Sequence, residues 1–163
     1  MAQVAPCYPQ ETQQFPAQLS TLLLDHFALL SPELRLSIVQ NLVMLRNKDV
    51  ISSLDLLRTL FPLLARARAA PLRSLIRNTI LSDLKNANMK TKNMRLNRAV
   101  QAMLFAMLER GMNDQVVGDK GKAKAADGAD GNSGGEALWA VLLTKELWKS
   151  GVWFVLSSSK CLR

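Results

Sequence analysis

The chain has 163 residues, of which 48% are hydrophobic and 21% are charged, and this balance excludes a disordered polymer. Its formal net charge of +8 favours a partner that carries negative charge. Leu, Ala and Met dominate the apolar residues and runs of β-branched residues are scarce, which indicates helices. We therefore expect an all-α chain with one folded domain and tails.

The cysteines and the N-terminal residues give no sign of secretion. Cys7 and Cys161 lie at opposite ends of the chain, and no Cys/His spacing predicts a zinc site. We expect two free thiols in a reducing compartment. The N-terminal stretch lacks the cationic start of a signal peptide, and no stretch has the roughly 18 uninterrupted apolar residues of a membrane span. We expect a soluble intracellular protein without a membrane partner.

The first elements follow helical spacing. Residues 1–10 are expected to form a flexible leader, and residues 11–112 a helical-repeat domain whose first helix covers about 11–29. A second helix begins with Ser31 as N-cap and Pro32 at the first helical position, and it reaches about Asn47. Its apolar stripe consists of Leu34, Ile38, Val39, Leu42, Val43 and Leu45.

A third helix is expected to start with Ser52 or Ser53 as its cap. Pro62 removes one helical hydrogen bond, so we expect a kink or an early end at that residue. The apolar residues at helical spacing are Leu54, Leu57, Phe61 and Leu64.

The fourth helix follows Pro71, and the fifth covers about 93–110. Gly111 is placed to stop the fifth helix. Phe105 lies opposite the main apolar stripe, which is typical of a helix sandwiched between neighbours. The inward residues are Leu72, Leu75, Ile76, Thr79, Ile80 and Leu84 in the fourth helix, and Leu96, Val100, Met103, Leu104, Met107 and Leu108 in the fifth.

Residues 113–135 differ in composition, because they hold six of the eight glycines mixed with Lys, Asp and Ala. We expect a disordered insertion. Its "GDKGK" lacks the spacing of a phosphate-binding loop and no strand precedes it. Residues 136–153 are predicted to be a further helix of the same domain, and residues 154–163 an irregular tail that looks aberrant. The stripe expected on this last helix is Leu138, Val141, Leu142, Lys145 and Trp148.

A weak internal repeat indicates the fold class. When Pro32 is aligned with Pro71, the second helix matches the fourth at several further positions, and Asn47 falls on Asn86. A period of about 40 built from helix pairs is typical of HEAT or armadillo solenoids, although Leu-rich helices can match by chance. We predict stacked antiparallel helix pairs, with an extended surface for macromolecules and no deep pocket. We call this superposition of Pro32 on Pro71 the repeat alignment.

The positive charge is concentrated in one part of the chain. Nine cations lie between Arg66 and Arg98 against one acid, Asp83, which accounts for the whole net charge of +8. This pattern favours a polyanionic partner, either RNA phosphates or an acidic protein surface. The structural alternatives are solvated helix faces for the cations and helix caps for the asparagines. The candidate surface consists of Arg73, Arg77, Lys85, Asn86, Asn88, Lys90, Lys92, Asn93, Arg95 and Arg98.

The sequence gives little support for a catalytic function. His26 is the only histidine, and a packed or exposed position is the simpler interpretation. No Ser or Cys has a partner base nearby in sequence. We therefore expect no enzymatic activity, no cofactor, no metal site and no small-molecule substrate. The methionines at helical spacing are interpreted as core residues, and Trp139, Trp148 and Trp153 as packing residues.

Two motifs carry a family resemblance. "LRNKD" is followed by "DLKNANMKTKNMRLN", which fits the pattern D-[IL]-K-N-x-N-x-K-x-K-N-x-x-[LV]-N. This pair resembles the amino-terminal region of the severe-depolymerisation-of-actin family over about residues 20–112, and more loosely over 136–153. The first motif forms a turn that we add to the candidate surface. Its polar residues are Arg46, Asn47, Lys48 and Asp49.

The resemblance implies a scaffold without catalytic activity in the nucleus and nucleolus. The implied partner is the precursor of the large (60S) ribosomal subunit, through assembly proteins or rRNA phosphates, and the implied process is its maturation and export. The family is also linked to actin organisation and cell-cycle progression. Its members are several hundred residues long. An alternative from another class is a solenoid-type transport adaptor that binds acidic or helical peptides of cargo proteins.

Overall fold

The computed structural model describes residues 2–8, 10–118 and 133–151, with the side chains of 113–118 and 133–135 excepted. This part of the chain is helical and contains no strand, so the all-α prediction is confirmed. Its elements are η1 (Ala5–Cys7), α1 (Phe15–Asp25), α2 (Pro32–Asn47), α3 (Ser53–Arg66), α4 (Ala70–Asn88), α5 (Met94–Gly118) and α6 (Ser133–Lys149).

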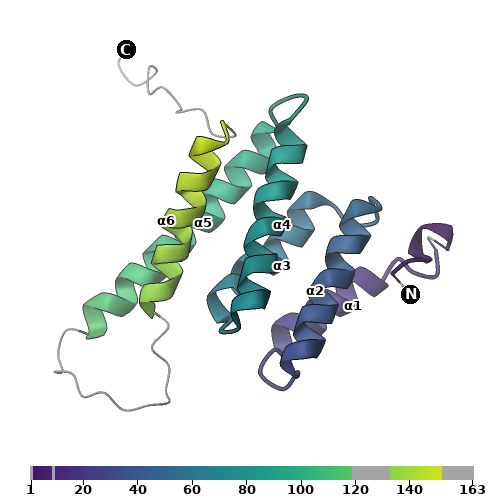
Figure 1. The fold of residues 1–163 in the computed structure, drawn as a ribbon, viewed down its shortest axis with the longest axis horizontal. Coiled ribbons are helices and arrows are strands. Elements are labelled where there is room, and N and C mark those ends of the chain that lie inside the picture. Colours follow the sequence, from purple (N-terminus) through teal and green to yellow (C-terminus); the bar gives the residue numbers. More distant parts are fainter. Residues whose placement is uncertain (1, 9, 119–132, 152–163) are drawn as a thin grey trace.

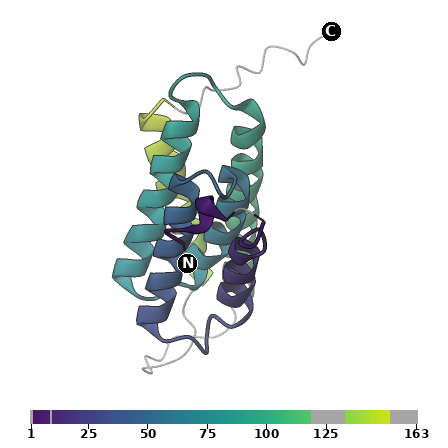
Figure 2. The same cartoon turned by 90° about the vertical axis from the view of Figure 1, so that its right-hand side faces the viewer.

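The helices form a stack of antiparallel pairs in two layers. Helices adjacent in sequence pack as α1 with α2, α3 with α4 and α5 with α6. One layer holds α2, α4 and α6, and the other holds α1, α3 and α5 (Figures 1 and 2). The repeat alignment therefore superimposes two neighbours of one layer, α2 and α4. This arrangement confirms the predicted stacked helix pairs.

Helix α3 lies at the centre of the stack and is buried on most sides. Leu56, Leu57, Leu60 and Leu63 are all buried, since α3 contacts α1 and α5 within its layer and also packs against α4. The early end considered at Pro62 does not occur, because α3 continues to Arg66. Packing on both sides offsets the lost hydrogen bond, whose acceptor would be the carbonyl of an exposed residue that water can reach.

The predicted end of the fifth helix at Gly111 is wrong. Helix α5 continues through Gly111 to Gly118. A Cβ atom at Gly111 would lie 2.8 Å from both the Cβ and the backbone nitrogen of Ala137 in α6. The glycine therefore allows two helices to approach closely, and it does not act as a C-cap.

The stripe predicted for the last helix is also wrong. Ala140, Leu143 and Leu147 are buried, whereas Leu138 and Val141 are more than half exposed. Lys145 and Trp148, assigned to the same stripe, are exposed as well. The helix has apolar residues on two sides, and periodicity alone does not decide which side packs.

The outer face of α5 stays open in the described part of the chain. Phe105 is 64% exposed, so the predicted sandwich around α5 is not observed. Within the residues that the structure describes, no helix combines the length and apolar character needed to cross a lipid bilayer.

Residues 2–8, part of the expected leader, contact the helical domain. Ala2 and Ala5 are buried, and the single Thr12 hydroxyl proton is shared between the Ala5 and Tyr8 carbonyls, which lie 3.0 and 2.6 Å from Oγ1. These contacts attach residues 2–8 to the domain. Helix α1 is shorter at both ends than the predicted 11–29.

The two predicted irregular segments fall largely outside the described residues. Helix α5 extends into the first part of the expected insertion, and α6 begins at Ser133. Residues 119–132, the last residues of the predicted helix at 136–153 with Trp153, and the expected tail at 154–163 with Cys161 lie outside the description.

Candidate interaction surface at two helix corners

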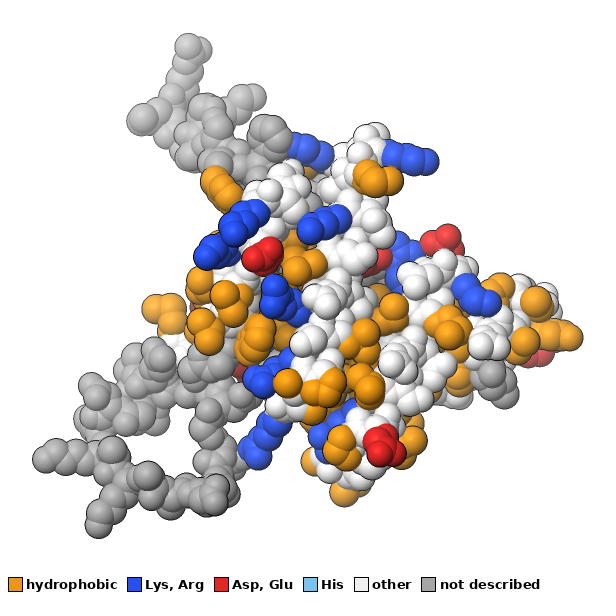
Figure 3. Space-filling view, viewed as in Figure 1, with side chains coloured by type: hydrophobic (Ala, Val, Ile, Leu, Met, Phe, Trp, Pro, Cys, Tyr) orange, Lys and Arg blue, Asp and Glu red, His pale blue; other side chains and the backbone are white. Residues whose placement is uncertain are grey.

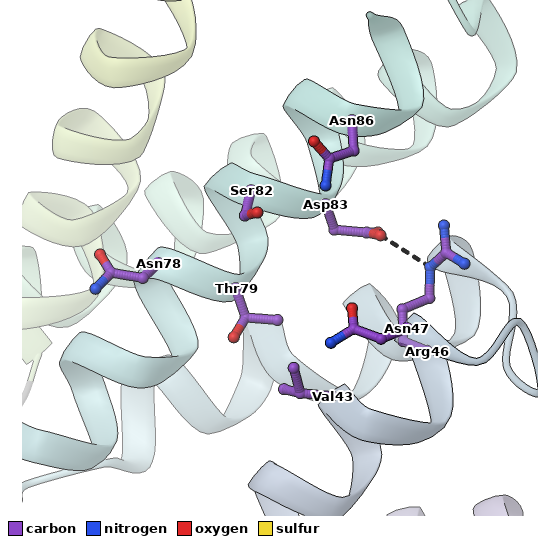
Figure 4. Close-up of a pocket in the computed structure, with 8 residues that line it drawn as sticks. All are labelled: Val43, Arg46, Asn47, Asn78, Thr79, Ser82, Asp83 and Asn86. Carbon is purple, nitrogen blue, oxygen red and sulfur yellow. Dashed lines mark hydrogen bonds and ion pairs between the residues drawn. The ribbon is translucent and has the colours of Figure 1, made fainter.

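Arg46 joins three helices at the α2–α3 corner. Its Nε donates to Asp83 Oδ1 of α4, the contact drawn as a dashed line in Figure 4, and the two atoms are 2.8 Å apart. Its two terminal nitrogens donate to Asp49 Oδ1 at 2.9 Å and to Ser53 Oγ, at the start of α3, at 2.7 Å. The side chains of Arg46 and Asp83 are only 21% and 10% exposed. The side chain of Arg46, the arginine of the first motif, therefore has a structural role: it connects α2 to α3 and α4.

The rest of this corner closes the end of α2. Asp49 adopts the left-handed conformation with φ 57°, and its N–H donates to the Arg46 carbonyl at 3.0 Å. The Lys48 ammonium donates to the Gln3 carbonyl at 2.6 Å. Ser52, one of the two predicted candidates, is the N-cap of α3 and accepts from the Asp55 N–H at 3.2 Å. The first motif thus has a structural role at most of its positions.

A network of asparagine amides builds the α4–α5 corner. Asn88 and Asn97 exchange side-chain hydrogen bonds at 2.9 and 3.0 Å across the two helices. Asn88 Nδ2 also donates to the Leu84 carbonyl at 2.8 Å, and its Oδ1 accepts from the Asn93 N–H at 3.0 Å. Asn93 Oδ1 in turn accepts from the Leu96 N–H at 3.1 Å and caps α5. Asn88 and Asn93, placed in the candidate surface, therefore order the corner.

The cations at this corner point outward. Lys85, Lys90, Lys92, Arg95 and Arg98 are all exposed. The only acid between Arg66 and Arg98 is Asp83, which is turned inward to Arg46. The asparagine network holds the backbone of the corner while the cations stay on its surface.

Arg73 and Arg77 behave differently from the corner cations. Both are half-buried on α4, and the Arg73 guanidinium lies 5.5 Å from the centre of the Trp139 ring of α6. Arg77 Nε is buried without a hydrogen-bond partner. Sequence reasoning places both on a free helix face because it cannot foresee that α6 packs against α4.

The packing of α6 adds cations that sequence reasoning misses. Lys145 and Lys149 of α6 are exposed, although the predicted stripe turns Lys145 inward. Figure 3 shows Lys and Arg side chains gathered over both α4 and α6 on one face of the molecule. The contact between two helices far apart in sequence extends the basic surface, and no local pattern in the sequence indicates this contact.

The candidate catalytic groups stand apart. His26 is exposed at the end of α1, and Cys7 is an exposed free thiol. Across residues 2–8, 10–118 and 133–151, no three His, Cys, Asp or Glu side chains cluster as metal ligands would.

Comparison with known proteins gives one family. The family model described as "SDA1, HEAT repeat" matches residues 1–123. Protein SDA1 of Chaetomium thermophilum is 39% identical over 153 residues, which cover 94% of this chain and 17% of that protein. Protein sda1 of Schizosaccharomyces pombe is 34% identical over 154 residues, or 94% of this chain and 21% of its own.

The Drosophila melanogaster protein named SDA1 homolog is 41% identical over 109 residues, which cover 67% of this chain and 15% of that protein. The chain thus spans about a fifth or less of the length of these curated relatives. The stacked helix pairs agree with the HEAT-repeat description of the matching model. The chain belongs to the SDA1 family of HEAT-repeat proteins.

Proposed function

We propose that the chain acts as a non-enzymatic scaffold in the assembly of the large ribosomal subunit, in the nucleus and nucleolus. Family membership and the motif resemblance support this role. The stacked helix pairs support it as well, because solenoids present extended surfaces to macromolecules. Export of the precursor particle and effects on actin organisation and the cell cycle belong to the same proposal.

The α4–α5 corner is the proposed contact with ribosomal RNA. The observation that carries this assignment is the inward orientation of Asp83, the only acid between Arg66 and Arg98, which pairs with Arg46. Lys85, Lys90 and Arg95 make no ion pair within the described residues. Uncompensated cations attract a phosphate backbone over a distance of about one Debye length.

The chemistry of the corner favours phosphates over bases. The segment from Lys85 to Arg98 contains no aromatic residue on which a base could stack. Lys and Arg side chains on a fixed backbone neutralise phosphates without reading sequence. We therefore propose that the corner positions the protein on the RNA backbone. Recognition of a particular RNA sequence would come from other contacts in the precursor particle.

A salt titration tests the phosphate contact directly. The affinity of the purified chain for a large-subunit rRNA fragment should fall with salt by a log–log slope of about 0.7 to 0.9 per neutralised phosphate. Lys90→Gln should lower that slope by about one such step. The control Arg58→Gln removes an exposed cation of α3 and should leave the slope unchanged. Equal slopes for all three proteins would contradict the assignment.

Affinity purification from nuclear extract tests the cellular role. The tagged chain should enrich large-subunit precursor RNA and assembly proteins, and the variant Lys90→Glu/Arg95→Glu should lose that enrichment. The variant Arg58→Glu/Arg110→Glu changes the net charge equally at two exposed positions outside the corner, and it should retain the enrichment. Enrichment of cargo proteins with weak salt dependence, in place of precursor particles, would favour a transport adaptor.

A further inference from the structure

A polar groove lies between α2 and α4, beside the Arg46–Asp83 ion pair. It has a volume of about 260 Å³, and Figure 4 shows side chains from both helices along it. Asn47 comes from α2, whereas Asn78 and Asn86 come from α4. Neighbouring helices of one layer therefore supply amides to the same groove.

The amides of the groove have no partners in the protein. Asn47, Asn78 and Asn86 are exposed, and their side chains make no hydrogen bond to the rest of the described chain. This distinguishes them from Asn88 and Asn97, whose amides are used within the α4–α5 corner. The hydrogen-bonding capacity of the groove is thus available to a ligand.

The internal repeat places two of these amides at a spacing that suits an extended peptide. Asn47 and Asn86 occupy equivalent positions in the repeat alignment. Packed neighbouring helices lie about 8–10 Å apart, and an extended peptide advances about 3.3 Å per residue. Side chains on α2 and α4 could therefore contact backbone groups about two to three residues apart on one extended segment.

The charges of the groove cancel, and this argues against RNA. Arg46 and Asp83 line it as an ion pair at 2.8 Å. The Arg46 guanidinium is already engaged by Asp83, Asp49 and Ser53, so a phosphate would find no free cation here. The lining contains no aromatic residue for base stacking. A partner with neutral donors and acceptors fits better.

One buried atom of the lining also lacks a partner in the described chain. Asp83 Oδ2 is buried and accepts no hydrogen bond, and the side chain as a whole is 10% exposed. A buried carboxylate oxygen without a donor is costly, and a water molecule or a ligand N–H at this position would satisfy it. A ligand N–H that reaches Asp83 after a small rotation of its side chain would do so.

We propose that the α2–α4 groove binds an extended peptide segment of a partner protein through the unpartnered amides of Asn47, Asn78 and Asn86. Amide side chains carry both a donor and an acceptor, as does each residue of a peptide backbone. The hydroxyls of Thr79 and Ser82 in the lining add further donors and acceptors. A helical peptide would need an apolar groove, because its own backbone groups are already paired.

This inference goes beyond the proposed RNA contact and does not depend on it, because the groove and the corner cations are separate sets of side chains. The groove shares Arg46, Asn47 and Asn86 with the candidate surface, but it contains none of the exposed cations of the α4–α5 corner. The peptide should be of low net charge, since the groove is neutral.

A phage-displayed library of random peptides, selected on the full chain, provides the probe. Selected peptides should bind the triple variant Asn47→Ala/Asn78→Ala/Asn86→Ala at least about tenfold more weakly, a difference equivalent to about 1.4 kcal/mol. The matched control Asn41→Ala removes an asparagine of α2 that bonds to the Ser37 carbonyl outside the groove, and it should bind as the wild type does. Circular dichroism should show equal helix content in all three proteins.

Three outcomes would overturn the proposal. These are the absence of any enriched peptide, equal binding of the selected peptides by the triple variant, and a loss confined to single-stranded RNA binding in that variant. The corner variant Lys90→Glu/Arg95→Glu should still bind the peptides. If the peptide proposal fails, the proposed RNA contact is therefore unaffected. The salt titration tests that contact separately.

Discussion

The two corners of the molecule occupy equivalent places in the repeat and are held by different chemistry. The repeat alignment pairs Arg46 with Lys85 and Asp49 with Asn88. At the α2–α3 corner, charge closes the turn: Arg46 bonds to three acceptors and Asp49 is left-handed. At the α4–α5 corner, α4 continues to Asn88 and amides close the turn.

The difference explains why only one corner offers its cations to a partner. An arginine fork can satisfy several acceptors at once, whereas a lysine in the equivalent place is a single point charge. Lys85 makes no ion pair within the described residues, so the amides take over the structural role there. A basic motif therefore indicates a binding surface only where its cations are not already bonded to acceptors within the protein.

The largest expected effect comes from removing the arginine of the first corner. Arg46→Ala should lower the free energy of unfolding by about 3 kcal/mol, because it leaves the carboxylate of Asp83 buried without its cation. Urea denaturation would measure the change. Arg58→Ala is the control, since Arg58 and Asp55 form an exposed ion pair at 3.7 Å that should contribute less than about 1 kcal/mol.

The variant Arg46→Lys sharpens this test. A lysine can reach one of the three acceptors but cannot replace the fork, so its stability should fall between those of the wild type and Arg46→Ala. A loss for Arg46→Ala no larger than that for Arg58→Ala would show that charge does not hold the first corner.

The second corner should depend on its amides. Asn88→Ala removes the acceptor of the Asn93 N–H and the partner of Asn97, which is 7% exposed. We expect a loss of about 1–3 kcal/mol, the usual cost of leaving buried polar groups unpaired. Hydrogen exchange at the Asn93 amide should become faster. Asn86→Ala, at an exposed position of the same helix, should change stability by less than about 0.5 kcal/mol.

Equal stabilities of the two asparagine variants would refute the difference between the corners. A stable Asn88→Ala with fast exchange at Asn93 would instead mean that the corner opens locally without loss of the helices around it.

Much of the fold could be predicted from the sequence where a helix has one apolar side. The buried residues Ile38, Leu42 and Leu45 of α2 lie on the predicted stripe. Leu34, at the exposed first turn, is the exception. Helix α6 has two apolar sides, and the choice between them depends on packing that no local pattern contains. The same limit applies to Gly111, whose missing side chain makes room for Ala137 of another helix.

The candidate site was less predictable than the fold. The sequence correctly indicated that asparagines can cap helix ends, and Asn93 does so. It could not show that Arg46 pairs with Asp83, because these residues are far apart in the sequence and only the stacking of α2 on α4 brings them together. That pair removes one arginine from the candidate surface and also removes the only acid of the basic segment.

The smallest expected effect concerns the backbone of the first corner. In Asp49→Gly, a left-handed residue loses its steric strain of about 1 kcal/mol, while the unfolded chain gains entropy worth about 0.5–1 kcal/mol. The ion pair with Arg46 is also lost, but the Asp49 side chain is 89% exposed and contributes little. These terms nearly cancel, so stability should change by less than about 0.5 kcal/mol.

Two further variants show whether this balance is the correct account. Asp49→Val keeps a side chain but places a β-branched residue at positive φ, so it should cost about 1–2 kcal/mol. Asn88→Gly, the same glycine substitution at the equivalent position, should cost at least as much as Asn88→Ala, since Asn88 is helical and its amide is used. Glycine would then be neutral at one corner and destabilising at the other, because the first depends on a backbone conformation and the second on a side chain.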